Sequence, residues 1–268
     1  MTLYMLNLYQ PTAYLRYRLR SGNAHGLHSP FVYGLYTTVI CQKGAFRAYG
    51  RIEWRRRKLL KSDKIITVKD FGAGSQVAGA GGTERRVSAI ARHAAKPPRL
   101  AQLLFRLVNH FQPATILELG TSLGLTTAYL AMADSRNQVV TFEGCPNTAA
   151  VALETFTRLR LRNVRLVEGN LDQTLPAALA TLKKPVDFVF FDGNHRREPT
   201  LRYFEQCLAN AHENSVFVLD DIHWSAEMEQ AWEAIKAHPA VTVTVDLFYV
   251  GLVFFRKKQP RQDFWLRY

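Results

Sequence analysis

One stretch of this 268-residue chain constrains its fold more than any other, an apolar run that ends in an acid and a glycine turn. Residues 115–119 (TILEL) are rich in β-branched and aliphatic side chains, and Gly120 and Gly124 follow, four positions apart. The next residues, 125–133, are typical of a helix. A strand, a glycine turn and a helix in this order bring backbone N–H groups at the helix N-terminus close to a bound ligand. We therefore expect a ligand site at this turn.

Strand and helix signals alternate through the rest of the chain. Residues 186–191 (VDFVFF) are almost continuously apolar, as expected for a parallel strand that is covered by helices on both faces. The expected strands are residues 115–119, 138–142, 164–167, 186–191, 215–219, 242–247 and 249–255, and the expected helices are 125–133, 148–161, 175–182, 199–209 and 225–237. The last two strands are nearly contiguous, which predicts an antiparallel hairpin. The sequence thus predicts an α/β fold with a doubly wound, mostly parallel seven-stranded sheet whose last strand is antiparallel.

The first part of the chain has a different character. Residues 1–95 are predicted to form a helical, basic N-terminal extension with a glycine-rich loop, and residues 96–268 the ligand-binding domain. Helices are expected from Pro30 to about residue 40, at 84–95 and at 100–111. Glycines lose much backbone entropy on ordering, so we interpret the segment 70–82 as a loop or lid over bound ligand.

The formal net charge of +13 admits two interpretations. The run Arg55-Arg56-Arg57-Lys58 has the density of a phosphate-contacting cluster, which would suit RNA, a phosphorylated metabolite or a membrane surface. The alternative, which we favour, is a solvated basic surface. No run of about 18 apolar residues is present, so no membrane span is expected. Three cysteines without metal-binding spacing fit a reducing cytoplasm.

Acidic residues end almost every expected strand. Ligands bind at the carboxyl ends of the strands in an open α/β sheet, so these acids are expected to share one site. They are Glu118, Glu143, Glu168, Asp192, Asp220 and Asp221. A dinucleotide-binding loop would need the pattern Gly-x-Gly-x-x-Gly, whereas residues 120–124 (GTSLG) carry only two glycines at a wider spacing. This difference argues against a dehydrogenase.

Four motifs in order resemble a known family. They are residues 118–124 (ELGTSLG), Glu143, residues 187–193 (DFVFFDG) and residues 219–221 (LDD). Together they resemble the class I S-adenosylmethionine-dependent methyltransferases, and most of all the catechol O-methyltransferase-like branch, over about residues 95–256. The resemblance implies that the chain binds S-adenosylmethionine. The implied cofactor-binding residues are Gly120, Thr121, Ser122 and Gly124 beside the methionine part, with Glu118 fixing this loop, Glu143 at the ribose, Gly169, Asn170, Leu171 and Asp172 around the adenine, and Asp192.

The resemblance also implies a catalytic centre. In the metal-dependent members, an acid at the position of Asp192 and a pair of an acid and an Asn at the positions of Asp220 and Asp221 bind Mg²⁺ or another divalent cation, and oxygen ligands of this kind suit such an ion. This sequence departs from the pattern twice, since Asp221 replaces an Asn and His195 replaces the Lys general base. His195 is either the base, with Asp192 as its catalytic partner, or a group that only positions Asp192. For His223, a helix-cap or surface histidine is the preferred interpretation over a further ligand.

These observations predict methyl transfer from S-adenosylmethionine to a hydroxyl oxygen of a small molecule, in the cytoplasm. The alternative is an RNA-modifying methyltransferase whose basic N-terminal region grips phosphates. A third hypothesis is a cofactor-binding or scaffold protein that has lost catalysis. The N-terminal region is open to interpretation as a substrate lid or as the interface of a homodimer.

Overall fold

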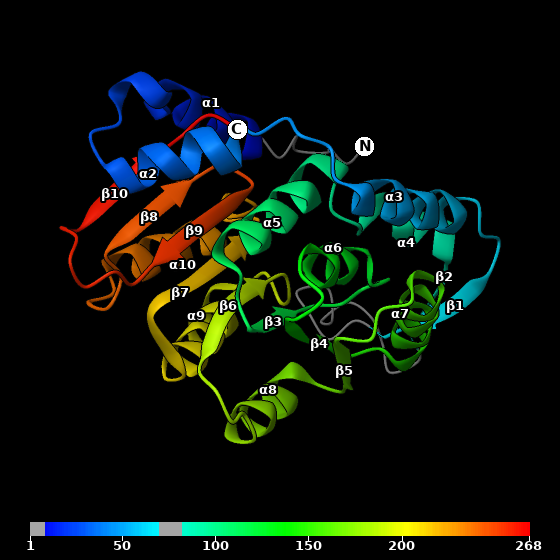
Figure 1. Ribbon diagram of the computed structural model, residues 1–268. Coiled ribbons are helices and arrows are strands. Elements are labelled where there is room, and N and C mark those ends of the chain that lie inside the picture. The colour runs from blue at the N-terminus through cyan, green and yellow to red at the C-terminus, as the bar shows by residue number, and fades with distance from the viewer. Residues whose placement is uncertain (1–8, 70–81) are drawn as a thin grey trace, which may run out of the picture.

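The computed structural model describes residues 9–69 and 82–268, and its centre is a mixed eight-stranded sheet (Figure 1). The strand order is β10-β8-β9-β7-β6-β3-β4-β5. The strands are β3 (Thr115–Leu119), β4 (Gln138–Glu143), β5 (Val164–Glu168), β6 (Val186–Phe191), β7 (Ala211–Asp220), β8 (Val243–Asp246), β9 (Val250–Phe254) and β10 (Gln262–Trp265). Only β9 runs antiparallel to its neighbours β7 and β8, which confirms the predicted doubly wound sheet and its closing hairpin.

The structure adds an eighth strand to the seven that the sequence predicts. Strand β10 pairs in parallel with β8 at the edge of the sheet, with Phe264 opposite Val245. Its four residues, QDFW, follow Pro260 and a basic run, and they carry no alternating apolar pattern. The tertiary contact with β8 therefore creates this strand, because the local sequence does not mark it.

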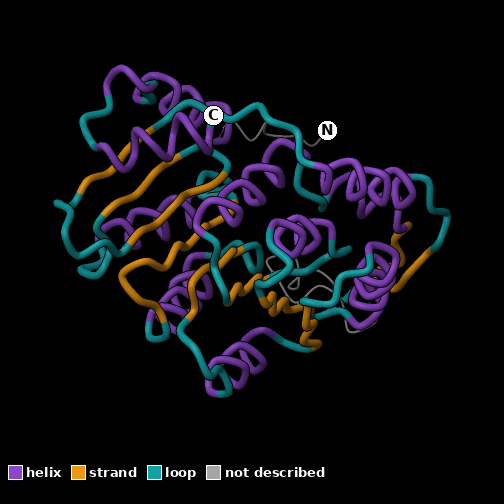
Figure 2. Tube along the Cα trace, in the orientation of Figure 1, coloured by secondary structure: helices purple, strands orange, loops and turns teal. Residues whose placement is uncertain are grey.

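Helices cover both faces of the sheet (Figure 2). The helices of the sheet region are α5 (Pro98–Phe111), α6 (Leu125–Ala133), α7 (Pro146–Leu159), α8 (Leu171–Ala180), α9 (Arg197–Leu208) and α10 (Ala226–Ala237). Ile116 and Phe188 join the hydrophobic cluster that contains side chains of α5 and α6. Their neighbours Leu117 and Val189 join the cluster of α8, α9 and α10 on the other face. Helix α8 starts at Leu171, earlier than expected, because the Asn170 side chain caps it.

The N-terminal segment packs directly onto this sheet and its helices. Its elements are α1 (Tyr9–Arg20), η1 (Ala24–Gly26), α2 (Pro30–Leu35), η2 (Tyr36–Ile40), α3 (Arg47–Leu60), β1 (Ile65–Val68), β2 (Thr83–Arg86) and α4 (Val87–His93). Val32 of α2 shares a cluster with Leu252 of β9, and Ile52 of α3 shares one with Tyr129 of α6. The extension and the sheet therefore share hydrophobic cores. The expected helix at 84–95 begins only at Val87, because residues 83–86 pair with β1. The predicted glycine-rich lid lies, except for Gly82, outside the described residues.

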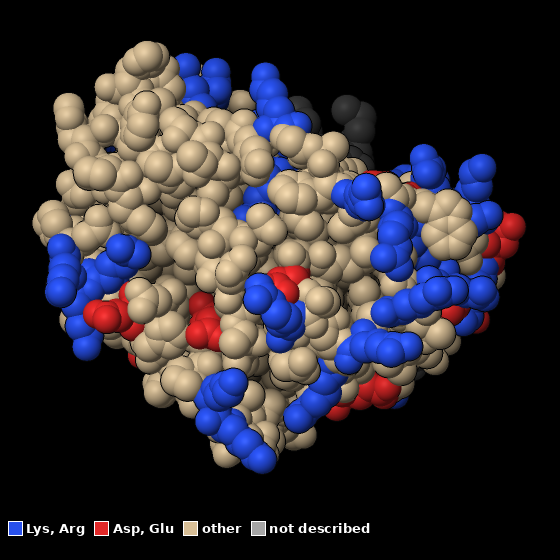
Figure 3. Space-filling view, in the orientation of Figure 1, with Lys and Arg blue, Asp and Glu red and all other residues tan. Residues whose placement is uncertain are grey.

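The basic run of α3 is divided between the interior and the surface. Arg55 and Arg56 are 6% and 7% exposed, whereas Arg57 is exposed. The Arg55 guanidinium donates to Thr155 Oγ1 over 3.2 Å and pairs with Glu154 over the same distance, so it fastens α3 to α7. Figure 3 shows basic side chains over the region of α3 and β1, with acidic side chains among them. None of the described helices has both the length and the apolar character that crossing a bilayer requires.

Candidate active site

The central parallel strands bring acidic side chains to one edge of the sheet, as the sequence predicts. Glu118 lies in β3, Asp192 follows β6, and Asp220 ends β7, and these three strands are adjacent in the sheet. Ser122, Asn194 and Asp221 follow the same three strands, and all three have left-handed backbones with φ of +49°, +54° and +52°. Each such conformation costs a non-glycine residue on the order of 1–3 kcal/mol, and this kind of strain gathers at functional sites.

The two glycines of the turn after β3 are required by close approaches of other segments. Gly120 has φ +111°, and a Cβ atom there would lie 2.4 Å from the carbonyl oxygen of Asp192. Gly124 has φ +76°, and a Cβ atom there would lie 2.6 Å from the Phe156 ring of α7. The turn is therefore held between the loop after β6 and helix α7, and neither glycine can carry a side chain.

Glu118 precedes this turn in β3 and is fully buried. Its Oε2 accepts hydrogen bonds from the hydroxyls of Thr127 and Thr141, but its Oε1 has no partner among the described residues. Burial raises the pKa of this carboxyl to about 8, although the two hydroxyl donors counteract part of the rise. A buried carboxyl oxygen without a hydrogen-bond partner fits a ligand that can donate to it, such as one with an ammonium or N–H group. The cofactor that the resemblance implies carries such a group on its methionine part.

The other predicted cofactor residues make contacts within the protein. The Glu143 carboxylate accepts the backbone N–H groups of Ser122 and Cys145, each over 2.9 Å, and thus joins the turn after β3 to the end of β4. The Asp172 carboxylate accepts from Arg202 and Tyr203 of α9, over 2.6 and 2.5 Å. Gly169 has φ +128° at the end of β5, as a sharp turn into α8 requires. The binding roles of these residues, and those of Asn170, Leu171 and Thr121, stay predictions.

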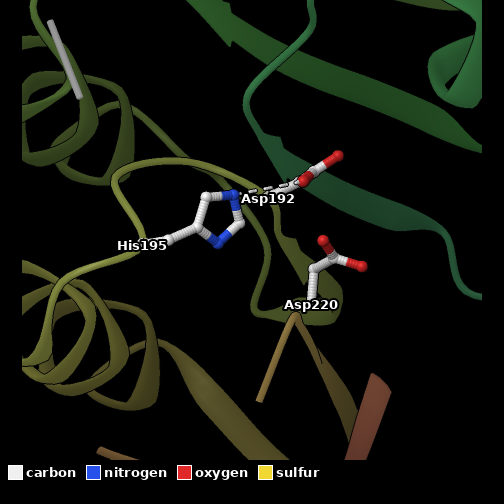
Figure 4. Close-up of side chains that lie close together, drawn as sticks. All are labelled: Asp192, His195 and Asp220. Carbon is white, nitrogen blue, oxygen red and sulfur yellow. Dashed lines mark ion pairs between the residues drawn. The ribbon is translucent and has the colours of Figure 1, made fainter. Parts of the chain in front are cut away.

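The structure brings together the acids that were expected to bind a metal. Asp192, His195 and Asp220 each offer a donor atom, and these atoms lie within 4.8 Å of one another (Figure 4). His195 Nε2 is 3.7 Å from Asp192 Oδ1. Asp220 is 1% exposed, and its Oδ1 has no hydrogen-bond partner among the described residues. Asp221 lies at the same edge with its side chain 29% exposed.

A lysine that the sequence analysis did not single out lies among these acids. Lys96 Nζ donates to Asp220 Oδ2, and it is 3.1 Å from Asp192 Oδ1 and 3.9 Å from Asp221 Oδ2. Lys96 stands in the connection between α4 and α5, directly before Pro97. The only local signal is a lysine before two prolines, which marks a helix boundary and not a site. Its role becomes visible only when the connection is placed over the sheet edge.

Burial and charge act against each other in this cluster. Burial disfavours the charged form of Lys96, but the attraction of Asp192, Asp220 and Asp221 outweighs it, and the pKa of the ammonium lies above its usual value. Burial raises the pKa of Asp220 and of Asp221 to about 6, and Lys96 offsets part of the rise in each. Burial also raises the pKa of Asp192, against the effect of Lys96. The ammonium is thus the main charge that keeps the three acids ionised together.

His223 differs from the expectation of a surface or helix-cap residue. It is 9% exposed, its Nε2 lies 2.8 Å from Asp246 Oδ2, and its ring stacks on Phe248 with centroids 5.2 Å apart. The surface interpretation was wrong because the end of β8 and the following Phe248 cover the ring. His223 therefore joins the loop after β7 to the end of β8.

Two pockets adjoin the acidic cluster, and Trp224 lines both of them. One has a volume of about 400 Å³ and is lined by Lys96, Asp221 and the rings of Tyr249 and Tyr268, among other residues. The other has a volume of about 890 Å³ and is lined by His195 and polar residues of α9 and α10. The smaller pocket combines aromatic rings with charged groups in its lining, which suits a ring-bearing molecule that carries a polar group.

Comparisons with known proteins give a consistent result. A family model described as a methyltransferase domain matches residues 117–222. A curated catechol O-methyltransferase from Niastella koreensis is 30% identical over 127 residues, which are 47% of this chain and 57% of that protein. The chain thus matches a little over half the length of this relative.

Solved structures are also similar. The O-methyltransferase from Bacillus cereus, in complex with S-adenosylhomocysteine, has a TM-score of 0.55 and 18% identity, and the match covers 83% of this chain and 96% of that chain. An S-adenosylhomocysteine-bound methyltransferase from Podospora anserina has a TM-score of 0.56 and 13% identity, with 96% and 99% covered. At these identities the structural likeness shows the fold alone.

Proposed function

We propose that this chain, whose fold and motifs are those of the class I S-adenosylmethionine-dependent methyltransferases of the catechol O-methyltransferase-like branch, transfers a methyl group to a hydroxyl oxygen of a small molecule. One observation carries the proposal. The turn after β3 follows Glu118, whose Oε1 has no hydrogen-bond partner in the described part of the chain, and it abuts the loop that bears Asp192. A cofactor seated on this turn would have its reactive end beside the acidic cluster and the aromatic pocket.

The residues of the turn suit the methionine part of the cofactor. Gly120 and Gly124 allow the backbone to approach it, Thr121 and Ser122 lie between them, and Glu118 Oε1 would accept a hydrogen bond from its ammonium group. Glu143 stands at the end of β4, where ribose hydroxyls would lie, and residues 169–172 follow β5, where the adenine would lie. When bound, S-adenosylmethionine supplies a methyl group on a positively charged sulfur, which becomes a neutral thioether as the acceptor oxygen takes the methyl.

The chain would contribute positioning and proton transfer. An acceptor in the aromatic pocket would lie against Trp224 and Tyr249, with its hydroxyl toward the acids. His195 would accept the hydroxyl proton, and Asp192, 3.7 Å away, would stabilise the imidazolium that results. Holding the oxygen and the methyl carbon in line accounts for much of the acceleration in reactions of this kind.

The RNA alternative lacks a supporting observation. Arg55 and Arg56, the first half of the basic run, are buried and bonded within the fold. None of the relatives named above is described as acting on nucleic acid. We also infer a reducing compartment such as the cytoplasm from the free cysteines Cys41, Cys145 and Cys207. The homodimer stays a prediction, which sedimentation measurements can test.

Calorimetric titration with S-adenosylmethionine and S-adenosylhomocysteine tests the proposal. We expect both to bind with micromolar Kd, and Glu118→Ala to weaken binding. Incubation of the protein and S-adenosylmethionine with a panel of small hydroxyl compounds, followed by mass spectrometry, would then identify a methylated acceptor. Absence of binding by both ligands would refute the proposed function. Binding without any methylated product from the panel would favour the scaffold hypothesis.

A further inference from the structure

The acidic cluster at the sheet edge requires a positive charge. Asp192 and Asp220 are adjacent across β6 and β7, and the Asp220 side chain is 1% exposed. Several carboxylates in so little solvent repel one another unless a cation lies between them. In the metal-dependent relatives that the sequence resembles, a divalent ion has this role. Here Lys96, whose side chain is 13% exposed, already supplies a positive charge.

The position of Lys96 is incompatible with an ion at the same place. Mg²⁺ lies about 2.0–2.1 Å from its oxygen ligands, and Ca²⁺ about 2.3–2.6 Å. Lys96 Nζ is hydrogen-bonded to Asp220 Oδ2 and is 3.1 Å from Asp192 Oδ1. An ion bound to these same two oxygens would overlap the ammonium group. The donor set of Asp192, Asp220 and His195 is assembled, and the ammonium group occupies the position between Asp192 Oδ1 and Asp220 Oδ2.

We propose that the ammonium group of Lys96 is the resident cation of this site and replaces the divalent metal ion. Lys96 reaches the site from the connection between α4 and α5, whereas the acids come from the ends of β6 and β7. The histidine at position 195 fits the same arrangement. Since Lys96 supplies a lysine charge from elsewhere in the chain, the residue three positions after Asp192 need not be a lysine.

The replacement of the metal ion by Lys96 has a consequence for the acceptor, and this part of the inference rests on the proposed function. Lys96 and Asp221 line the aromatic pocket of about 400 Å³. The ammonium group can therefore donate a hydrogen bond to the acceptor oxygen and stabilise its developing negative charge, as a metal ion would. A single charge on a tethered side chain binds one oxygen well but cannot chelate two. The site should thus accept molecules with one hydroxyl as well as those with two adjacent hydroxyls.

Binding of Mn²⁺ in the absence of cofactor and acceptor tests the inference independently of methyl transfer. The protein is treated with EDTA, desalted and titrated with Mn²⁺, and free Mn²⁺ is followed by electron paramagnetic resonance. We expect no stoichiometric binding by the wild type and binding at least about tenfold tighter by Lys96→Ala, which exposes the carboxylates to the ion. The double variant K96A/D220N should lose the gained binding. The matched control is Lys236→Met, which removes another buried lysine, one paired with Glu233 outside the site.

Each outcome decides the inference. Stoichiometric Mn²⁺ binding by the wild type would overturn it, and so would a folded Lys96→Ala protein that binds Mn²⁺ no better than the wild type. Lys96→Met, which keeps the apolar stem, is measured alongside in case the shorter side chain prevents folding. A rise in melting temperature with Mn²⁺ in either variant, and not in the wild type, would support the inference. Failure of S-adenosylhomocysteine to bind would instead count against the proposed function and leave this result unaffected.

Discussion

The backbones of Gly120 and Asp192 approach so closely that a Cβ atom on Gly120 would lie 2.4 Å from the Asp192 carbonyl oxygen. The turn after β3 and the loop after β6 are thus in direct contact. The N–H of Asp192 also donates to the carbonyl of Leu119 over 2.9 Å, which fixes the same contact from the other side. The turn after β3, where we place the cofactor, and the acidic cluster are therefore structurally coupled, and a substitution in one should affect the other.

Gly120→Ala should destabilise the protein and abolish S-adenosylhomocysteine binding. The new methyl group would overlap backbone atoms of Asp192, and φ +111° is strained for any residue with a Cβ. We expect a loss of unfolding free energy of about 2 kcal/mol or more, measured by urea denaturation. The control is Gly50→Ala in the interior of α3, where a Cβ would meet no atom within 4 Å. That change should stabilise by about 0.5–1 kcal/mol. Unchanged stability of Gly120→Ala would contradict the close approach.

Glu118 should make the unliganded protein less stable as the pH rises. Its pKa is about 8 when folded and near the ordinary 4.5 when unfolded, so between these values the folded protein retains a proton that the unfolded chain has released. Stability from this group therefore falls from about pH 5 to about pH 8 and is level above, with a slope of at most about 1.4 kcal/mol per pH unit. Glu118→Gln lacks the titration. We therefore expect a stability difference, the unfolding free energy of Glu118→Gln minus that of the wild type, that rises with pH over this range. A difference that stays constant with pH would refute the prediction.

His195→Gln should separate catalysis from binding. If His195 accepts the acceptor proton, kcat should fall by about 10²–10⁴-fold, because a general base contributes that much. The Kd of S-adenosylhomocysteine should stay within about twofold, since His195 is not among the residues expected to contact the cofactor. The control is His28→Gln, at an exposed position far from His195 in the sequence. It should leave both kcat and the Kd of S-adenosylhomocysteine unchanged. A variant with near wild-type kcat would restrict His195 to positioning Asp192.

Arg55→Ala should affect stability and not nucleic-acid affinity. The substitution removes the hydrogen bond to Thr155 and the pair with Glu154, and it leaves a gap between α3 and α7. We expect a loss of about 1–3 kcal/mol in urea denaturation. The neighbouring exposed residue offers the matched control, since Arg57→Ala should change stability by no more than about 0.5 kcal/mol. RNA binding that is steeply salt-dependent and weakened by Arg57→Ala would instead revive the RNA hypothesis.

The sheet and its functional edge could be predicted from the sequence because their signals are local. Apolar runs such as 186–191 mark buried parallel strands wherever they occur, and an acid at the end of each run falls at the same edge of the sheet. The turn at residues 120–124 needs glycines for its own backbone, so a turn at this position could also be predicted. Strand β10 was missed because its four residues become a strand only beside β8.

The charge that completes the acidic cluster was decided by tertiary structure alone. The chain has 35 lysines and arginines, and nothing in the sequence around Lys96 distinguishes it from the other 34. It becomes the partner of Asp192 and Asp220 only because the connection between α4 and α5 crosses the ends of β6 and β7. His223 was likewise judged exposed, since its burial depends on Asp246 and Phe248 from a later hairpin. The sequence by itself determined where the acids gather, because backbone periodicity is local. Which cation they hold was decided by a contact between segments that are distant in the chain, and such a contact exists only in the folded protein.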